Sequence, residues 1–308
     1  MVASLLLAAA VAVSSPPPRA VFGPGVISAS TDATGPAFTP DGNTVYFTRG
    51  NGSFCQLFVS HRSGGTWSTP EVAPFSGAWR DLEASMSPSG AFLVFSSNRP
   101  ASVGAAPVDA HYGNTLHSAM GGNLWIVRRD GGGWGTPERL PAAINDNDSV
   151  FSPSVAANGD IYFMKPVPPK GSFEIFRSRF VHGAYQTAEL MPFSDPQYGN
   201  VDPAVAPDQS FIVFSSNRSS TNSGRGLFIS FRHGDTWTAP ENLDPIYGLP
   251  GGEIEAKLGP DGHTLYYSNA EVVPPSSPAT QADIDAMLTW NNGLVHIWNI
   301  DLTPVLRP

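Results

Sequence analysis

Five acidic residues in repeated positions are the main candidates for chemistry in this sequence. Each stands seven or nine residues before the last residue of a tight turn: Asp81, Glu83, Asp202, Glu253 and Glu255. Residues two apart on a strand point the same way, so we expect these carboxylates to crowd one place. Crowded carboxylates raise one another's pKa, which suits an acid–base pair or a cation site. If the protein is an enzyme, we expect Glu83, Asp202 and Glu255 to be catalytic.

A structural role competes with this chemistry. Arg99 and Arg218 end two copies of the segment Phe-Ser-Ser-Asn-Arg and occupy matching registers. Such arginines are well placed to form salt bridges with the carboxylates. We favour salt bridges over a ligand or cation site, and we favour both over catalysis.

Two long insertions, residues 100–122 and 270–293, are expected on the same rim as the carboxylates. Long loops on a repeat scaffold usually carry specificity. Loop histidines can act as metal ligands, acids or bases, or be merely solvated, and a tryptophan can stack on a sugar or pack between blades. The ligand-binding candidates are Trp79, Arg80, Asp81, Arg99, His111, Tyr112, His117, Asn200, Arg218 and Glu253.

The segment Asn145-Asp-Asn-Asp148 offers alternating oxygen donors. Such donors suit Ca²⁺, which makes Asp146 and Asp148 weak metal candidates. The spacing is not that of an EF-hand loop, and we favour a local Asx-turn. No cofactor other than this Ca²⁺ is expected.

The strands and turns expected to position these residues belong to one sequence repeat. An acidic residue, an apolar run, a tight turn, a second apolar run and Phe-Ser-Ser-Asn-Arg occur in order at 81–99 and again at 200–218. A repeat of this length made of strands and turns predicts a β-propeller. The turn recurs in five registers: Pro40-Asp41-Gly42, Pro88-Ser89-Gly90, Ala157-Asn158-Gly159, Pro207-Asp208-Gln209 and Pro260-Asp261-Gly262.

A Trp-x-x-Pro-Glu marker indicates the outermost strand, where Pro is tolerated at a sheet edge. The fifth repeat ends at 295–300 without this marker, and residues 20–27 offer a replacement strand. We therefore predict an all-β propeller of five four-stranded blades, closed by this N-terminal strand. Six blades are the alternative, if the N-terminal segment and the tail after Ala270 build more.

The tight turn followed by Phe-Ser-Ser-Asn-Arg resembles the PD40 (WD40-like, TolB-type) propeller repeat. The resemblance covers nearly all of the chain after residue 30. It implies a propeller fold but leaves function open, because such repeats occur in periplasmic TolB, in peptidase propellers and in oligogalacturonate lyases.

The amino-acid composition excludes some classes of binding partner. The net charge is −9 and Lys and Arg do not cluster, so we expect no nucleic acid, and an acidic surface also disfavours anionic membranes. Cys55 is the only cysteine, so no disulfide forms within the chain. Residues 1–19 are interpreted as a signal peptide and a Pro-rich linker, although no Lys or Arg precedes the apolar run. Residues 20–308 are then a single domain, exported to the periplasm or secreted, monomeric and without a membrane span.

Strand order places the inner-strand starts, the residues after Phe-Ser-Ser-Asn and the insertions on one face, opposite the tight turns. The first hypothesis is a binding module for a protein or a glycan on this insertion-bearing face. The alternative is a carbohydrate-active enzyme, a glycoside hydrolase or polysaccharide lyase. In it, Glu83 and Asp202 or Glu255 act as acid and base, and Arg99 or Arg218 holds an acidic sugar.

Overall fold

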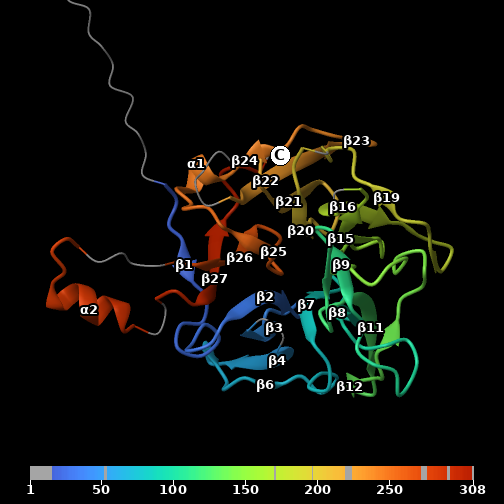
Figure 1. The fold of residues 1–308 in the computed structure, drawn as a ribbon, viewed down its shortest axis with the longest axis horizontal. Helices are drawn as coiled ribbons and strands as arrows, with labels where there is room; N and C mark the ends of the chain where they lie inside the picture. Colours follow the sequence, from blue (N-terminus) through green and yellow to red (C-terminus); the bar gives the residue numbers. More distant parts are fainter. Residues whose placement is uncertain are drawn as a thin grey trace, which may run out of the picture.

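Five small β-sheets surround a common axis, like the blades of a propeller (Figure 1). This computed structural model describes residues 16–51, 54–169, 171–195, 197–218, 224–271, 276–289 and 292–306. Residues 1–15, the apolar part of the expected signal peptide, lie outside the described residues. The chain is a five-bladed β-propeller, so the alternative of six blades is wrong.

Each blade runs from an inner strand at the axis to an outer edge. Blade 1 contains β2 (Ala33–Phe38), β3 (Thr44–Asn51), β4 (Phe54–Ser63), β5 (Thr66–Trp67) and β6 (Glu71–Val72). Blade 2 contains β7 (Asp81–Met86), β8 (Phe92–Ser97), β11 (Asn123–Asp130), β12 (Gly133–Trp134) and β13 (Glu138–Arg139). Blade 3 contains β14 (Phe151–Val155), β15 (Ile161–Val167), β16 (Ser172–Ser178) and β19 (Glu189–Leu190), with a hairpin of β17 (Phe180–Val181) and β18 (Ala184–Tyr185).

Blade 4 contains β20 (Asn200–Val205), β21 (Phe211–Ser216), β22 (Gly226–His233), β23 (Thr236–Trp237) and β24 (Glu241–Asn242). Blade 5 contains β25 (Ile254–Leu258), β26 (Thr264–Ala270), β27 (Val295–Asp301) and β1 (Ala20–Val21). The remaining elements are the hairpin of β9 (Ala110–Tyr112) and β10 (Thr115–His117), and the short helices α1 (Asp244–Tyr247) and α2 (Gln281–Met287). In blades 1, 2 and 4 the outer edge consists of two short strands on either side of the marker proline, which cannot donate to a ladder.

The predicted closure by the N-terminal strand is confirmed. β1 pairs antiparallel with β27, so that Ala20 faces Asn299 and Val21 faces Trp298. The next residue, Phe22, makes edge-to-face contacts with Phe38 and Trp67 of blade 1 and Tyr266 of blade 5, with ring centroids 5.1–5.6 Å apart. The closing strand therefore joins blade 5 to blade 1 as well as completing blade 5.

The apolar core lies between the blades. Among the described residues, five buried clusters each fill the space between two neighbouring blades. Between blades 1 and 2, for example, Tyr46 and Leu57 pack against Phe95 and Trp125. This face-to-face packing explains why large side chains are abundant in the strands.

All five inner strands have a β-bulge at the same repeat position. The pairing register shifts there in every blade, and one residue in each bulge has a positive φ of 50–57°. These bulge residues are Gly35, Glu83, Ser152, Asp202 and Glu255. A bulge breaks the two-residue alternation of a strand. The expectation that residues 81 and 83 point the same way assumed a regular strand, and the strand is not regular at this position.

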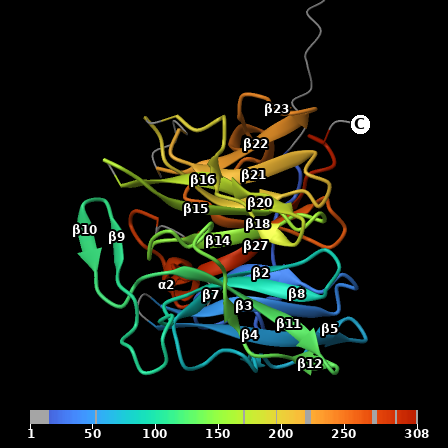
Figure 2. The same ribbon diagram turned by 90° about the vertical axis from the view of Figure 1, so that its right-hand side faces the viewer.

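The two ends of the propeller differ. Figure 2 shows the β9–β10 hairpin on one side of the molecule, and β5 and β12, which follow the loops between third and fourth strands, on the opposite side. We call the first side the insertion face and the second the turn face. Among the described residues, none of the helices has the length and apolar character needed to cross a bilayer.

Candidate functional site

The three predicted catalytic carboxylates meet at the axis, but two of them hold neighbouring blades together. Oε2 of Glu83 accepts hydrogen bonds from the amide of Ser152 at 2.8 Å and from Oγ of Ser96 at 3.0 Å. Oδ2 of Asp202 accepts the amide hydrogen of Glu255 at 2.9 Å. Both side chains are buried. Each carboxylate therefore accepts a backbone hydrogen bond across the boundary between two blades.

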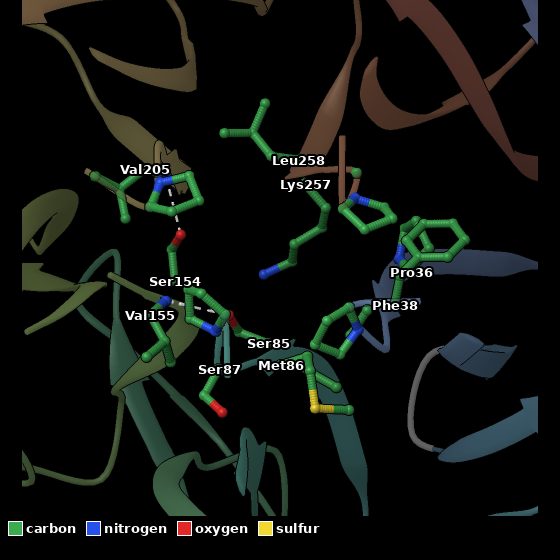
Figure 3. Close-up of a pocket in the computed structure, with 17 residues that line it drawn as sticks. Pro36, Phe38, Ser85, Met86, Ser87, Ser154, Val155, Val205, Lys257 and Leu258 are labelled. Carbon is green, nitrogen blue, oxygen red and sulfur yellow. Dashed lines mark hydrogen bonds between the residues drawn. The ribbon is translucent and has the colours of Figure 1, made fainter. Parts of the chain in front are cut away.

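Lys257 accompanies the carboxylates at the axis. Its Nζ donates to the carbonyl of Pro153 in blade 3 at 2.9 Å. Burial lowers the pKa of Lys257, and the neighbouring Glu83 and Asp202 oppose that effect. Figure 3 shows the side chain entering the centre of a cavity of about 130 Å³ on the turn face, beside Ser85 and Ser154. The lysine thus adds a hydrogen-bond donor to an interior that holds three carboxyl groups.

Glu255 shares this acidic environment with the other two carboxylates. Burial, with the charges of Glu83 and Asp202, raises the pKa of Glu255 to about 8. Burial and the charge of Asp202 also raise the pKa of Glu83. Oε2 of Glu255 is buried without a hydrogen-bond partner among the described residues. At neutral pH Glu255 therefore keeps its proton, but its free oxygen is not open to solvent.

The predicted salt bridge is present between Asp81 and Arg99. Nη2 of Arg99 lies 2.9 Å from both oxygens of Asp81, and the pair is buried. Burial raises the pKa of Asp81 while Arg99 lowers it. The guanidinium also stacks on Phe95 and Trp125, at 5.1 and 5.3 Å from the ring centroids. The carboxylate of Asp81 and the guanidinium of Arg99 are therefore paired with each other inside blade 2.

The equivalent residues of blades 4 and 5 have other partners. Arg218 donates to the carbonyl of Phe193 at 3.3 Å and stacks on Tyr198 at 5.3 Å. Asn200 donates to Oε2 of Glu174 at 2.6 Å. Oε1 of Glu253 accepts the Gly251 amide at 2.9 Å and the Asn269 side-chain amide at 3.0 Å. Burial raises the pKa of Glu253 to about 7.

A wide hollow opens on the insertion face. We call it the first hollow, and its volume is about 700 Å³. Its lining includes the polar, charged and aromatic side chains of His111, Asn114, Asp146, Asp148, Lys165 and Phe176. It therefore joins the β9–β10 hairpin to the segment before β14 and to strands β15 and β16. The sequence singled out His111, Asp146 and Asp148, and the fold brings them to one place.

The acidic segment of the first hollow is locally bonded. Oδ2 of Asp146 lies 2.5 Å from Nζ of Lys165, which sits 4.4 Å above the ring of Phe176. Oδ1 of Asn147 accepts the Ser149 amide at 2.8 Å, which is the expected Asx-turn. Within the described ranges, no three acidic, histidine or cysteine groups are placed to share a metal ion.

A second hollow of about 430 Å³ lies across the contact between two hairpin tips, where the amide of Gly113 donates to the carbonyl of Gly171 at 3.2 Å. Its main side chains are Tyr112, Phe173, Gln197, Tyr198, Asn217 and Arg225. His117 stacks on Tyr112, with centroids 3.9 Å apart. Of the sequence candidates, Tyr112 thus lines this second hollow and His117 supports it.

Trp79 and Arg80 line neither hollow. Both are half-buried, and the Arg80 amide donates to Oδ1 of Asn98 at 2.9 Å. The charge of Arg80 helps to lower the pKa of Glu83 against the effect of burial. Arg80 therefore acts electrostatically on the axis.

Sequence reasoning missed several residues of these sites, among them Lys165, Phe176, Arg225 and Lys257. Two of them depart from the repeat, which was an available signal. Lys165 stands where blades 2 and 4 have Ser97 and Ser216, and Lys257 stands where blades 2 and 3 have Ser85 and Ser154. Arg225 carries no repeat signal because it lies in the loop before β22.

Comparison with known proteins supports the fold alone. No family model and no curated protein matches the chain. The α-L-arabinofuranosidase PaAbf62A from Podospora anserina, solved with cellotriose, has a TM-score of 0.50 and 10% identity, covering 93% of this chain and 94% of the enzyme. A putative TolB from Agrobacterium tumefaciens has a TM-score of 0.49 and 16% identity, covering 79% of this chain and 73% of that protein. The Hadza microbial sialidase Hz136 has a TM-score of 0.44 and 13% identity, and this chain spans 54% of it.

Proposed function

We propose that the protein is an exported, TolB-like propeller that binds a glycan in the first hollow of the insertion face. The observation that carries the proposal is the composition of that hollow, which is lined by the hydrogen-bonding side chains of His111, Asn114 and Asp148 and also by the apolar ring of Phe176. Sugars present hydroxyl groups at their edges and apolar C–H surfaces on their faces, which such a lining complements.

Size and position agree with this proposal. A volume of about 700 Å³ falls within the usual range for small-ligand sites. The hollow lies on the loop-bearing end of a rigid scaffold, where binding residues are usually found. His111 and Asp148 are exposed, so a ligand can reach them.

The alternative of a carbohydrate-active enzyme at the axis is less favoured. An acid–base pair needs carboxyl groups that can reach substrate, whereas Glu83 and Asp202 are buried and accept backbone hydrogen bonds from the next blade. The raised pKa of Glu255 keeps the alternative testable. Release of reducing ends from a glycan that binds, with loss of that release in Glu255→Gln, would favour the enzyme.

Thermal unfolding and calorimetry against a panel of neutral and acidic oligosaccharides test the binding proposal. A ligand present at 100 times its Kd stabilises the fold by about 2.7 kcal/mol. The double variant His111→Ala/Asp148→Asn should weaken binding by about tenfold or more, which corresponds to about 1.4 kcal/mol. His233→Ala, an exposed histidine at the turn-face end of β22, is the matched control and should bind normally.

Two outcomes would contradict the proposal. If no oligosaccharide stabilises or binds the protein, the first hollow is not a glycan site, and a protein partner on the same face becomes the better hypothesis. If a glycan binds but the double variant binds it unchanged, the assignment to this hollow is wrong.

A further inference from the structure

The second hollow has an electrostatic character opposite to that of the whole protein. The chain carries a net charge of −9, yet Arg225 is the only charged side chain among the described residues that line this hollow. Arg218 lies behind it, stacked on Tyr198 at 5.3 Å. Because Glu174 and Asp195 interact with the charge of Arg218, the positive charge at this hollow is that of Arg225.

Arg225 keeps most of its hydrogen-bonding capacity. A guanidinium has five N–H donors in a planar fork that matches a carboxylate. Among the described residues, the Arg225 side chain makes one long hydrogen bond, from Nη1 to the carbonyl of Gly199 at 3.4 Å. The side chain is half-buried, so its position is limited without being closed to a ligand. This differs from Arg99, whose guanidinium is buried against Asp81.

Aromatic side chains line the same hollow. Tyr112 and Tyr198 are half-buried. The ring of His117 stacks on Tyr112, with centroids 3.9 Å apart, and the guanidinium carbon of Arg218 lies 5.3 Å from the ring centroid of Tyr198. Phe173 touches Tyr112 with ring centroids 5.1 Å apart. Side chains fixed in this way offer apolar surface at little cost in conformational entropy. Together with Arg225, they suit a sugar ring that has an apolar C–H face and carries an anionic group.

We propose that the second hollow binds a sugar that carries a carboxylate, a uronic acid residue, with the carboxylate on Arg225 and the ring against Tyr112 and Tyr198. This inference rests on the proposed glycan function and names its substrate class. The two hollows share the tips of the β9–β10 and β15–β16 hairpins. A glycan held in the first hollow can therefore extend toward Arg225.

Titration calorimetry of the full chain tests the proposal with oligogalacturonate, oligoglucuronate and the methyl ester of each, which is uncharged. We expect the acid forms to bind about tenfold or more tightly than the esters, since hydrogen bonds between ionised groups are about twice as strong as neutral ones. Arg225→Gln should abolish that preference, because it weakens binding of the acid far more than binding of the ester, and Arg225→Lys should keep part of it. Arg129→Gln removes an exposed arginine near the end of β11 on the turn face and should change nothing.

Each result decides between the two claims. If acid and ester bind equally, glycan binding stands and the role of Arg225 is wrong. If Arg225→Gln keeps the full preference for the acid, the carboxylate is recognised elsewhere and the inference is overturned. If neither form binds, the glycan function itself fails. Binding of a short peptide through its terminal carboxylate, lost in Arg225→Gln, would replace the sugar with a peptide ligand.

Discussion

Oε2 of Glu83 in blade 2 accepts the backbone amide of Ser152 in blade 3 at 2.8 Å. The two residues occupy the same repeat position in successive blades, and both have the positive φ of the axial bulge. The same relationship joins Asp202 to the amide of Glu255. Side chains at the axis therefore connect neighbouring blades where the ring is narrowest.

Glu83→Ala should lower the free energy of unfolding by about 1–3 kcal/mol, because it removes the acceptor of the Ser96 hydroxyl and leaves the buried Ser152 amide only its 3.1 Å hydrogen bond to Oγ of Ser96. Glu83→Gln keeps an oxygen acceptor and should lose less. Urea unfolding followed by circular dichroism measures both variants. Equal stability of Glu83→Ala and wild type would show that relief of repulsion with Asp202 fully offsets the lost hydrogen bonds, which would contradict the prediction.

Gly35→Ala should destabilise the ring at the junction of blades 5 and 1. Gly35 has φ +55°, and a Cβ placed there would lie 2.9 Å from Oε2 of Glu255. Gly64→Ala is a matched control, because Gly64 has φ +56° and open space around it. The control should cost about 1 kcal/mol for its left-handed backbone, and Gly35→Ala should cost at least about 1 kcal/mol more. Equal losses in chemical denaturation would mean that Glu255 moves aside freely.

Stability should fall as pH rises between about 4.5 and 7 because of Glu253. Burial raises the pKa of Glu253 from 4.5 to about 7, so in this range the folded protein holds a proton that the unfolded chain has released. Titration of Glu253 lowers the free energy of unfolding by up to about 1.4 kcal/mol for each pH unit in this range. Glu253→Gln should flatten the dependence, measured as urea unfolding at pH 5, 6 and 7.

Glu138→Gln controls for loss of one carboxyl group, since Glu138 is exposed and lies 3.6 Å from Arg128. Glu255 adds a contribution of the same sign that extends to about pH 8. The assignment to Glu253 fails if Glu253→Gln and wild type show the same slope between pH 5 and 7.

Phe22→Ala should weaken ring closure by about 2–3 kcal/mol, because the ring packs against three aromatic side chains from two blades. Phe180→Ala removes an equally large but exposed ring from the β17–β18 hairpin and should cost less than about 1 kcal/mol. Differential scanning calorimetry compares the two. A similar loss in both variants would argue against a special role for the closing segment.

The repeat made the fold predictable from the sequence. The directions of the axial side chains were not predictable in the same way, because the inner strands depart locally from regular strand geometry. Turn residues such as Pro260 and Asp261 mark strand ends directly, which allowed the blades to be counted. The axial bulge was not foreseen, although Pro36, Pro153 and Pro203 follow bulge residues inside inner strands, where proline interrupts a ladder. A prediction of side-chain direction that ignores the bulge fails for Asp81 and Glu83.

The hollows depend on loops that meet only in the folded molecule. His111 and Lys165 come from different blades, and Gly113 contacts Gly171 across the boundary between them. Such contacts leave no periodic pattern in the sequence, so the sequence identified His111 and Tyr112 but missed Lys165 and Arg225 in the same hollows. Arg225 replaced Arg99 and Arg218 as the arginine available to an acidic sugar because burial and stacking, which the sequence does not display, occupy the other two.

The pairing of β1 with β27 joins the first strand of the chain to the last. During synthesis on the ribosome, β1 emerges at the start and its partner only after four other blades have been made. Until then its apolar residues and backbone groups lack a sheet, and contacts between such distant segments form slowly. Such an unpaired strand is prone to pair with other chains. The same arrangement that makes the finished ring cooperative therefore gives the nascent chain a long interval in which a chaperone, or rapid export, would protect it.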